Sequence, residues 1–230
     1  MKNNFLLDAD ETILDFVRSS KKSLAVAMRE AGLPYEETDF TVYKRINDGI
    51  WREYERGEIA KPKLSVERFS RFFAEKGIKG DPVQLNALYF SALSRTGYLM
   101  DGAEDFLLQL KMRGKVFLIT NGTPAAQYGR LDALGIRSAF DGIFVSDEIG
   151  FAKPDPRFFE YVLQRISVSS ENCVVIGDSL TSDIAGANAA GINSVWYNPC
   201  RRQLPSGVRP DAIACTYTEV LAALDAVRNS

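Results

Sequence analysis

Four polar segments of this sequence carry side chains that could bind a phosphate group or a metal ion. Three of them directly follow a short apolar run with the composition of a buried strand, and the Lys-Pro pair lies in the loop after another such run. The segments are Asp8-Ala9-Asp10-Glu11-Thr12, Thr120-Asn121-Gly122, Lys153-Pro154 and Gly177-Asp178-Ser179-Leu180-Thr181-Ser182-Asp183. Ligands of open parallel sheets bind beyond the carboxyl ends of the strands, so such a sheet would bring these segments together. Any one of them could be an ordinary turn, helix cap or surface group. Their occurrence in order at successive strand ends favours one catalytic site.

The sequence contains no histidine, which limits the chemistry of such a site. Catalysis by serine or cysteine paired with histidine is excluded, and so are histidine metal ligands. Acid–base chemistry must come from Asp, Glu, Lys, Tyr or Cys, and a metal must be held by oxygen or by cysteine. Cys173, Cys200 and Cys215 are widely spaced and form no CxxC pair, so we expect neither a disulfide framework nor a zinc site.

Composition and charge are those of an ordinary globular protein. The 28 Lys and Arg residues nearly balance the 30 Asp and Glu residues, and 46% of the residues are hydrophobic. This balance gives no electrostatic signature of binding to a nucleic acid polymer. Apolar runs are too short for a membrane span, and the apolar stretch at the start is too short for a signal peptide. We therefore expect a cytoplasmic protein with no membrane partner, and the sequence leaves its oligomeric state open.

The chain contains two regions with different hydrophobic patterns, and these patterns predict where the four segments lie. Helical spacing dominates residues 16–95, where Ser65 is expected to cap one helix and Asp81-Pro82 the next. Elsewhere, expected strands at 4–8, 116–119, 142–145, 173–176, 193–196 and 212–214 alternate with expected helices at 102–113, 124–134, 156–166, 182–190 and 217–227. Short apolar strands between helices are typical of a parallel sheet buried on both faces. The prediction is an α/β fold, with a Rossmann-like doubly wound parallel sheet core (1–15 and 96–230) and an inserted all-helical cap domain (16–95).

The order and context of the four segments resemble the motifs of the haloacid dehalogenase superfamily. The matching residues are Asp8-x-Asp10-x-Thr12, Thr120-Asn121-Gly122, Lys153-Pro154 and Gly177-Asp178-x-x-x-x-Asp183. The resemblance spans the whole chain, with the helical insertion matching the C1-type cap that follows the first motif. The first motif and Tyr43-Lys44-Arg45-Ile46-Asn47 followed by Trp51 resemble the pyrimidine 5′-nucleotidase subfamily more narrowly. Glu11, where the superfamily usually has Gly, favours the same subgroup.

The resemblance implies a role for each motif residue. Asp8 would attack phosphorus and form an aspartyl-phosphate, and a free Asp, with a pKa of about 3.9, is ionised at neutral pH without tuning. Asp10 would protonate the leaving oxygen and then deprotonate the water that hydrolyses the intermediate.

Phosphate binding is expected from the second and third motifs. Thr120 and the backbone N–H groups of Asn121 and Gly122 precede a helix that begins at Pro124, and such a terminus binds anions. Lys153 would neutralise phosphate and nucleophile charge in the transition state.

The four acidic residues of the motifs require a further positive charge. Two like charges about 4 Å apart cost on the order of 4 kcal/mol at an effective dielectric constant of about 20, so Lys153 alone is not enough. An all-oxygen ligand set favours Mg²⁺, with Mn²⁺ as the other candidate. By resemblance, the ligands are the Asp8 carboxylate, the Asp10 backbone carbonyl and Asp178. Asp183 would orient ligands or water.

The prediction that follows is a Mg²⁺-dependent phosphomonoesterase of nucleotide metabolism, a nucleoside 5′-monophosphatase for pyrimidine nucleotides. Candidates in the cap to contact the base are Phe16, Tyr43, Asn47 and Trp51, although an aromatic stripe at helical spacing is also typical of core packing. A phosphatase for phosphoglycolate or a sugar phosphate remains an alternative with the same core. A dehalogenase fits Asp10 and the acidic metal set less well. A phosphomutase and a non-catalytic phosphate-binding protein complete the alternatives.

Overall fold

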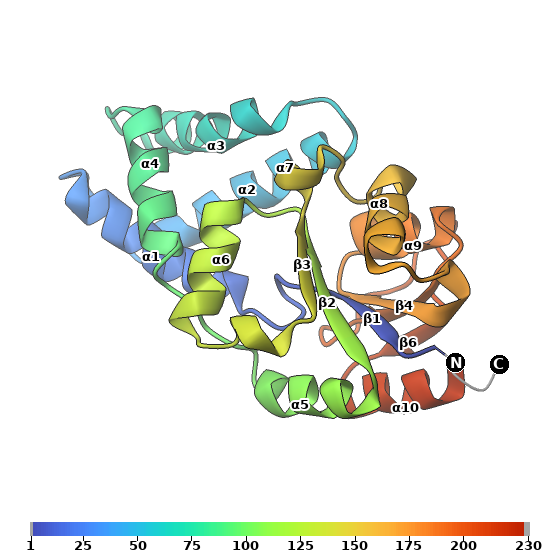
Figure 1. Cartoon of the computed structure of the whole chain (residues 1–230). Coiled ribbons are helices and arrows are strands. Elements are labelled where there is room, and N and C mark those ends of the chain that lie inside the picture. The colour runs from blue at the N-terminus through green and yellow to red at the C-terminus, as the bar shows by residue number, and fades with distance from the viewer. Residues whose placement is uncertain (1, 228–230) are drawn as a thin grey trace. The chain divides into compact units, whose positions relative to one another are not determined.

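The computed structural model describes residues 2–227 of the chain (Figure 1). The described strands form one parallel six-stranded sheet in the order β3-β2-β1-β4-β5-β6. They are β1 (Asn4–Asp8), β2 (Lys115–Thr120), β3 (Gly142–Val145), β4 (Cys173–Gly177), β5 (Asn193–Tyr197) and β6 (Ala212–Ala214). Each predicted strand is present to within a residue at either end, and the predicted fold class is confirmed.

Helices cover both faces of this sheet. They are α5 (Ala103–Arg113), α7 (Ser146–Ile149), α8 (Pro156–Ile166), α9 (Ala185–Ala189) and α10 (Tyr217–Val227), with 3₁₀ turns at Arg137–Ala139 and Ser170–Asn172 and a π-helical turn at Leu180–Ile184. Figure 1 places α5 and α10 on one side of the sheet and α8 and α9 on the other.

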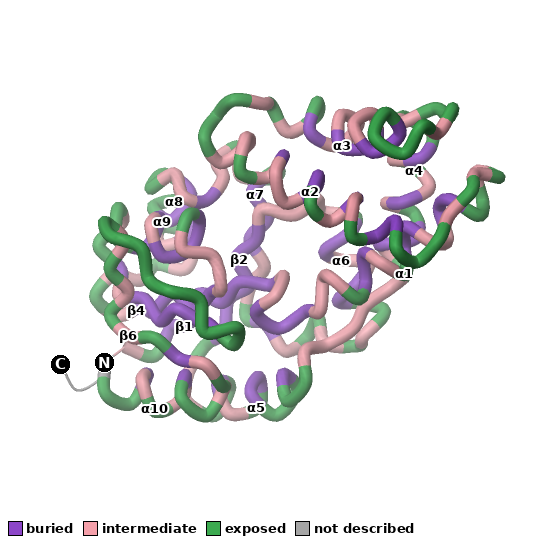
Figure 2. The backbone as a smooth tube through the Cα atoms, turned by 180° about the vertical axis from the view of Figure 1, so that it is seen from behind, coloured by how far each residue is buried: buried purple, intermediate pink, exposed green. Residues whose placement is uncertain are grey.

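The burial of β1 shows why its three central residues are apolar. Phe5, Leu6 and Leu7 are all 0% exposed, although successive side chains of a strand point to opposite faces. Leu6 belongs to the cluster that contains Phe158 and Phe159 of α8, which covers one of these faces. Figure 2 shows β1 and β4 in the colour of buried residues. In a strand buried in this way, a polar functional side chain can be placed only at the end, where the chain leaves the sheet.

The chain divides into two compact units. The first comprises the described residues of Met1–Asp15, Tyr98–Pro124 and Leu134–Ser230, and the second comprises Phe16–Gly97 and Ala125–Ala133. The second unit is helical, as predicted for residues 16–95, and contains α1 (Phe16–Glu30), α2 (Asp39–Glu55), α3 (Lys61–Lys76), α4 (Pro82–Leu93) and most of α6 (Pro124–Ala133).

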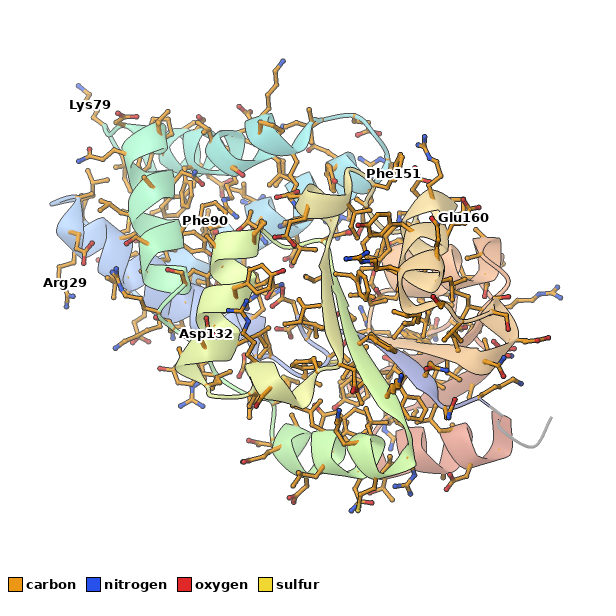
Figure 3. All side chains as sticks on the ribbon, in the orientation of Figure 1. Arg29, Lys79, Phe90, Asp132, Phe151 and Glu160 are labelled. Carbon is orange, nitrogen blue, oxygen red and sulfur yellow. The ribbon has the colours of Figure 1, made fainter. Side chains whose placement is uncertain are left out.

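Helix α6 was not expected in the second unit. Its Ala126 belongs to the same buried cluster as Phe69 and Tyr89, and Gly129 permits the close packing. A Cβ at Gly129 would lie 2.3 Å from the carbonyl oxygen of Ser94, so a larger residue would push α6 away. On the outside of this unit, Figure 3 shows Arg29 and Lys79 pointing away from the helices.

The structure corrects three local predictions. Ser65 does not cap a helix: α3 begins at Lys61 with Pro62 in its first turn, and the Ser65 hydroxyl donates back to the Lys61 carbonyl at 3.4 Å. The helix predicted at 182–190 is the π-helical turn followed by the short α9, and α7 was not predicted. The Asp81 cap is confirmed, because its carboxylate accepts from the Val83 N–H at 2.8 Å.

Within the described part of the chain, no helix combines the length and the apolar character that crossing a bilayer requires.

Candidate active site

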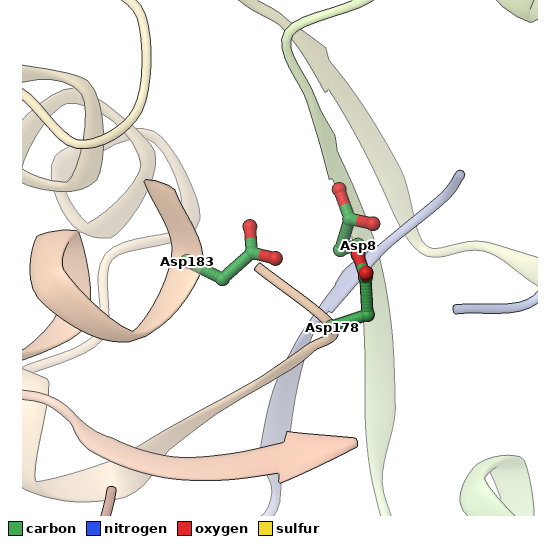
Figure 4. Close-up of side chains that lie close together, drawn as sticks. All are labelled: Asp8, Asp178 and Asp183. Atoms are coloured by element: carbon green, nitrogen blue, oxygen red, sulfur yellow. The ribbon is translucent and has the colours of Figure 1, made fainter. Parts of the chain in front are cut away.

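The carboxyl end of β1 lies at the centre of the site. β1 lies between β2 and β4, and the order of the strands along the chain reverses there, with β2 and β3 on one side and β4 to β6 on the other. Such a reversal opens a crevice beyond the strand ends. Asp8 is the last residue of β1, and Asp178 directly follows β4. Figure 4 shows Asp8, Asp178 and Asp183 together at this place.

Lys153 links the acidic residues of two motifs. Its Nζ donates to Asp8 Oδ1 at 2.7 Å, to Asp183 Oδ1 at 2.7 Å and to the Ile119 carbonyl at 3.0 Å. These contacts use all three donors of an ammonium group, and the residue is only 2% exposed.

Asn121 holds the backbone of Lys153 in place. Its side-chain nitrogen donates to the Lys153 carbonyl at 2.8 Å, and its oxygen accepts from the Lys153 N–H at 2.9 Å. The peptide bond between Lys153 and Pro154 is cis. The side chain of Asn121 therefore positions the lysine, in addition to the role predicted for its backbone.

The three acidic residues Asp8, Asp178 and Asp183 form a cluster that fits a metal ion. One carboxylate oxygen from each lies within 4.8 Å of the others. Oxygen ligands alone suit a hard divalent cation such as Mg²⁺. Asp183 has both oxygens engaged, since Oδ1 accepts from Lys153 and Oδ2 accepts from the Ser179 N–H at 3.1 Å. Asp183 is thereby better suited to orient the site than to serve as a direct ligand.

Gly177 makes room for the Asp183 carboxylate. A Cβ at Gly177 would lie 2.3 Å from Asp183 Oδ2, closer than any non-bonded contact allows. The glycine of the fourth motif is therefore required by Asp183, six positions later in the chain. A larger residue at this position would displace the carboxylate that accepts from Lys153.

The electrostatics of the cluster correct one prediction. Burial, with the charge of Asp183 in addition, raises the pKa of Asp8 to about 7, even though Lys153 lowers it. In the metal-free protein, Asp8 is therefore ionised less readily than a free aspartate, and neighbouring positive charge is needed to favour its ionised form. Burial and the charges of Asp8 and Asp183 also raise the pKa of Asp178 well above its ordinary value. The cluster holds more negative charge than its protein surroundings stabilise, which is the condition that a bound cation relieves.

The loop after β1 holds the Asp8 carboxylate through Thr12. The Thr12 hydroxyl, fully buried, donates to Asp8 Oδ2 at 3.1 Å, and its carbonyl accepts from the Tyr217 hydroxyl at 2.8 Å. Glu11 has φ of 61°, a left-handed conformation that favours glycine, which explains why glycine is usual here. Asp10 is partly exposed, two residues beyond Asp8. The sequence motif included Thr12 without a role, and nothing in the sequence indicated Tyr217.

The predicted phosphate loop has its own internal hydrogen bond. The Gly122 N–H donates to the Thr120 hydroxyl at 3.0 Å, so phosphate binding by this N–H would replace or share that bond. The adjacent Thr123 hydroxyl oxygen is buried, and it has no hydrogen-bond partner among the described residues. Thr123, which sequence reasoning missed, is thus an additional donor in this loop.

The four predicted base contacts lie in the second unit, and packing explains two of them. Tyr43 is fully buried and stacks on Phe69, with 5.5 Å between ring centroids. Asn47 is 4% exposed and its side-chain oxygen accepts from Arg68 Nη1 at 3.2 Å.

Phe16 and Trp51, the other two candidates, are partly exposed. The Arg130 guanidinium lies 5.7 Å from the Phe16 ring centroid, and Trp51 packs edge-on against Tyr54 at 5.6 Å. The expectation of base contact therefore rests more on these two residues than on the buried pair.

Comparison with known proteins relates this geometry to a family. The sequence matches the family described as haloacid dehalogenase-like hydrolase over residues 3–191. It is 35% identical to the pyrimidine 5′-nucleotidase PynA of Streptococcus pneumoniae, over 96% of this chain and 94% of that protein. It is 32% identical to the pyrimidine 5′-nucleotidase YjjG of Escherichia coli, over 88% of this chain and 89% of that protein.

A solved structure is similar along nearly the whole chain. The putative HAD-hydrolase YfnB of Bacillus subtilis is 37% identical in sequence, over 84% of this chain and 83% of that protein. Its crystal structure, described as bound to magnesium and as revealing interdomain movement, superposes with a TM-score of 0.92 and covers 96% of this chain and 98% of that one at 34% identity.

Proposed function

Because this chain belongs to the haloacid dehalogenase-like hydrolase family, we propose that it is a Mg²⁺-dependent phosphomonoesterase that hydrolyses pyrimidine nucleoside 5′-monophosphates. The observation that carries the proposal is the buried link from Asp8 through Lys153 to Asp183, with Asp178 beside it. A carboxylate held by a lysine at the end of a central strand, next to an all-oxygen cation site, suits nucleophilic attack on phosphorus.

The proposed reaction has two steps, and both use carboxylates. An oxygen of Asp8 forms a bond to phosphorus while the ester bond from phosphorus to the leaving oxygen breaks, and Asp10 gives its proton to that oxygen. Asp10 then accepts a proton from water as the water oxygen attacks phosphorus. The bond between phosphorus and Asp8 breaks, and inorganic phosphate leaves with Asp8 restored.

Charge compensation is the main task of the surrounding residues. Lys153 holds the Asp8 carboxylate and places a positive charge beside the transferred phosphoryl group. Asp8, the Asp10 backbone carbonyl and Asp178 would hold Mg²⁺, which supplies positive charge for the phosphate oxygens and the carboxylates. Thr120 and the N–H groups of Asn121 and Gly122, with the Thr123 hydroxyl in addition, would bind the remaining phosphate oxygens.

The choice of substrate is supported by the relatives rather than by the catalytic residues. Two relatives that match most of the chain are named pyrimidine 5′-nucleotidases. The partly exposed Phe16 and Trp51 have the aromatic faces that stack on a nucleobase.

A panel of phosphomonoesters assayed with Mg²⁺ tests the proposal. We expect higher kcat/KM for dUMP, UMP and dTMP than for sugar phosphates or phosphoglycolate, and no turnover of any of them by Asp8→Asn. Brisk turnover of a sugar phosphate beside negligible turnover of the nucleotides would overturn the nucleotidase assignment. Retained activity in Asp8→Asn would overturn the role of Asp8.

A further inference from the structure

An arginine far from the four motifs contacts the proposed metal ligand Asp178. Arg202 lies in the loop between β5 and β6, and its Nη2 donates to the Asp178 carbonyl oxygen at 2.6 Å. The same nitrogen lies 3.3 Å from Asp178 Oδ2. One guanidinium group therefore touches both the backbone and the side chain of this residue.

Two side chains hold Arg202 in this position. The Asn198 amide is 3% exposed; its nitrogen donates to the Arg202 carbonyl at 2.8 Å and its oxygen accepts from the Arg202 N–H at 2.9 Å. The guanidinium carbon lies 5.6 Å from the ring centroid of the fully buried Trp196. The Trp196 indole N–H donates to the Asp178 carbonyl at 2.9 Å, so two donors converge on one oxygen.

Within the described part of the chain, Asp178 has one cationic partner, Arg202. The three donors of Lys153 are used by Asp8, Asp183 and a carbonyl oxygen. Among residues 2–227, Arg202 is the only cationic side chain within ion-pair distance of Asp178. The loop is thus built to present one guanidinium to the turn that follows β4.

We propose that Arg202 is a positioning residue that fixes the carbonyl and the carboxylate of Asp178, and thereby prepares this side chain to bind a divalent cation. The inference rests on the proposed function, in which Asp178 is a metal ligand. The guanidinium would also repel a bound cation. Half of the Arg202 side chain is exposed, so solvent screens this repulsion. The Asp178 carbonyl, in contrast, is held in place by two hydrogen bonds.

A calorimetric titration of the metal-free protein with Mn²⁺, which gives the dissociation constant of the ion, tests the inference. Arg202→Met should bind Mn²⁺ about tenfold more weakly, the size of effect expected when a partner of a metal ligand is removed. Arg201→Met is the matched control, because Arg201 is exposed and its side chain makes no hydrogen bond or ion pair with the described residues. It removes the same charge from the same loop and should bind Mn²⁺ like the parent.

Trp196→Phe provides a second test if Arg202→Met fails to fold. It keeps an aromatic ring beside the guanidinium and removes one of the two donors to the Asp178 carbonyl. We expect Trp196→Phe to bind Mn²⁺ more weakly than the parent, because the Asp178 carbonyl loses one of its two donors. Binding as tight as that of the parent would contradict the inference that an anchored Asp178 carbonyl prepares the site.

Three further outcomes would contradict the inference. Binding by Arg202→Met as tight as that of the parent, or tighter, would show that the guanidinium is a bystander or a competitor of the cation. If Arg201→Met weakened Mn²⁺ binding as much as Arg202→Met does, the effect would come from the net charge of the loop and not from the contacts of Arg202. If the parent itself binds no Mn²⁺, the metal role of Asp178 in the proposed function fails, and the inference fails with it.

Discussion

Replacing the proposed nucleophile should make the metal-free protein more stable. Burial and the neighbouring Asp183 raise the pKa of Asp8 from 3.8 to about 7. One pKa unit corresponds to about 1.4 kcal/mol, so a shift of about three units means that the ionised Asp8 costs the folded chain about 4 kcal/mol. Asn stays neutral at every pH, and its amide can still accept from Lys153 and donate to the Thr12 hydroxyl.

The dependence on pH follows from the sign of the shift. Below about pH 4, Asp8 is protonated in both the folded and the unfolded chain, and it costs nothing. Between about pH 4 and about pH 7 the unfolded chain releases its proton first, so the stability of the parent falls as the pH rises. The advantage of Asp8→Asn should therefore be absent at about pH 4 and reach about 4 kcal/mol at about pH 8.

Urea denaturation in the presence of EDTA measures this difference. The matched control is Asp101→Asn, which removes an exposed carboxylate outside the cluster and should leave the free energy of unfolding nearly unchanged at each pH. Excess Mg²⁺ should close the gap, because a cation that binds the folded parent stabilises it. An Asp8→Asn variant no more stable than the parent at about pH 8 without metal, or a gap that does not shrink as the pH falls, would refute the reasoning.

Three further substitutions test the supports of the site. Lys153→Met should abolish turnover and, in EDTA at about pH 8, destabilise the fold by about 3–5 kcal/mol, because it leaves buried carboxylates unpaired; urea curves check this. Gly177→Ala should lower kcat at least about tenfold, since the new Cβ displaces the Asp183 carboxylate, with a loss of about 1–3 kcal/mol in stability; unchanged kcat would contradict it. Tyr217→Phe keeps the ring but removes the donor to the Thr12 carbonyl, and should cost about 1–3 kcal/mol of unfolding free energy in the same denaturation assay.

The sheet could be predicted because its strands carry a simple signal. A strand covered on both faces must be apolar at every position, so runs such as Val116-Phe117-Leu118-Ile119 stand out between helices. The polar segments at their ends follow from the same constraint, because only the end of a buried strand can hold a functional side chain. The structure brings Asp8, Asp178 and Asp183 to one place through the parallel order of the strands.

Local helix signals were less decisive. Ser65 has the residue type of a cap, but Pro62 suits the first turn of a helix and α3 begins before the serine. Competing signals a few residues apart cannot be ranked without knowing which residues the unit buries. The placement of α6 with the second unit depends on the close approach at Gly129, which a sequence pattern does not contain.

The residues that support the site act over long separations in the chain. Arg202 contacts a residue 24 positions earlier, and Tyr217 contacts one 205 positions earlier. No spacing rule links such pairs, because the fold alone brings them together. The raised pKa of Asp8 is likewise a property of burial and of its assembled neighbours, which the pKa of a free aspartate does not include.

Trapping the covalent intermediate tests the central claim most directly. A substrate labelled with ³²P, such as dUMP, is mixed with the Mg²⁺-loaded protein and quenched in acid during turnover, and the labelled peptide is then identified. The proposed mechanism predicts label on the peptide that contains Asp8, loss of that label after a chase with unlabelled substrate, and no label in Asp8→Asn. Release of labelled phosphate by the parent, with no label on Asp8 at any quench time, would contradict it.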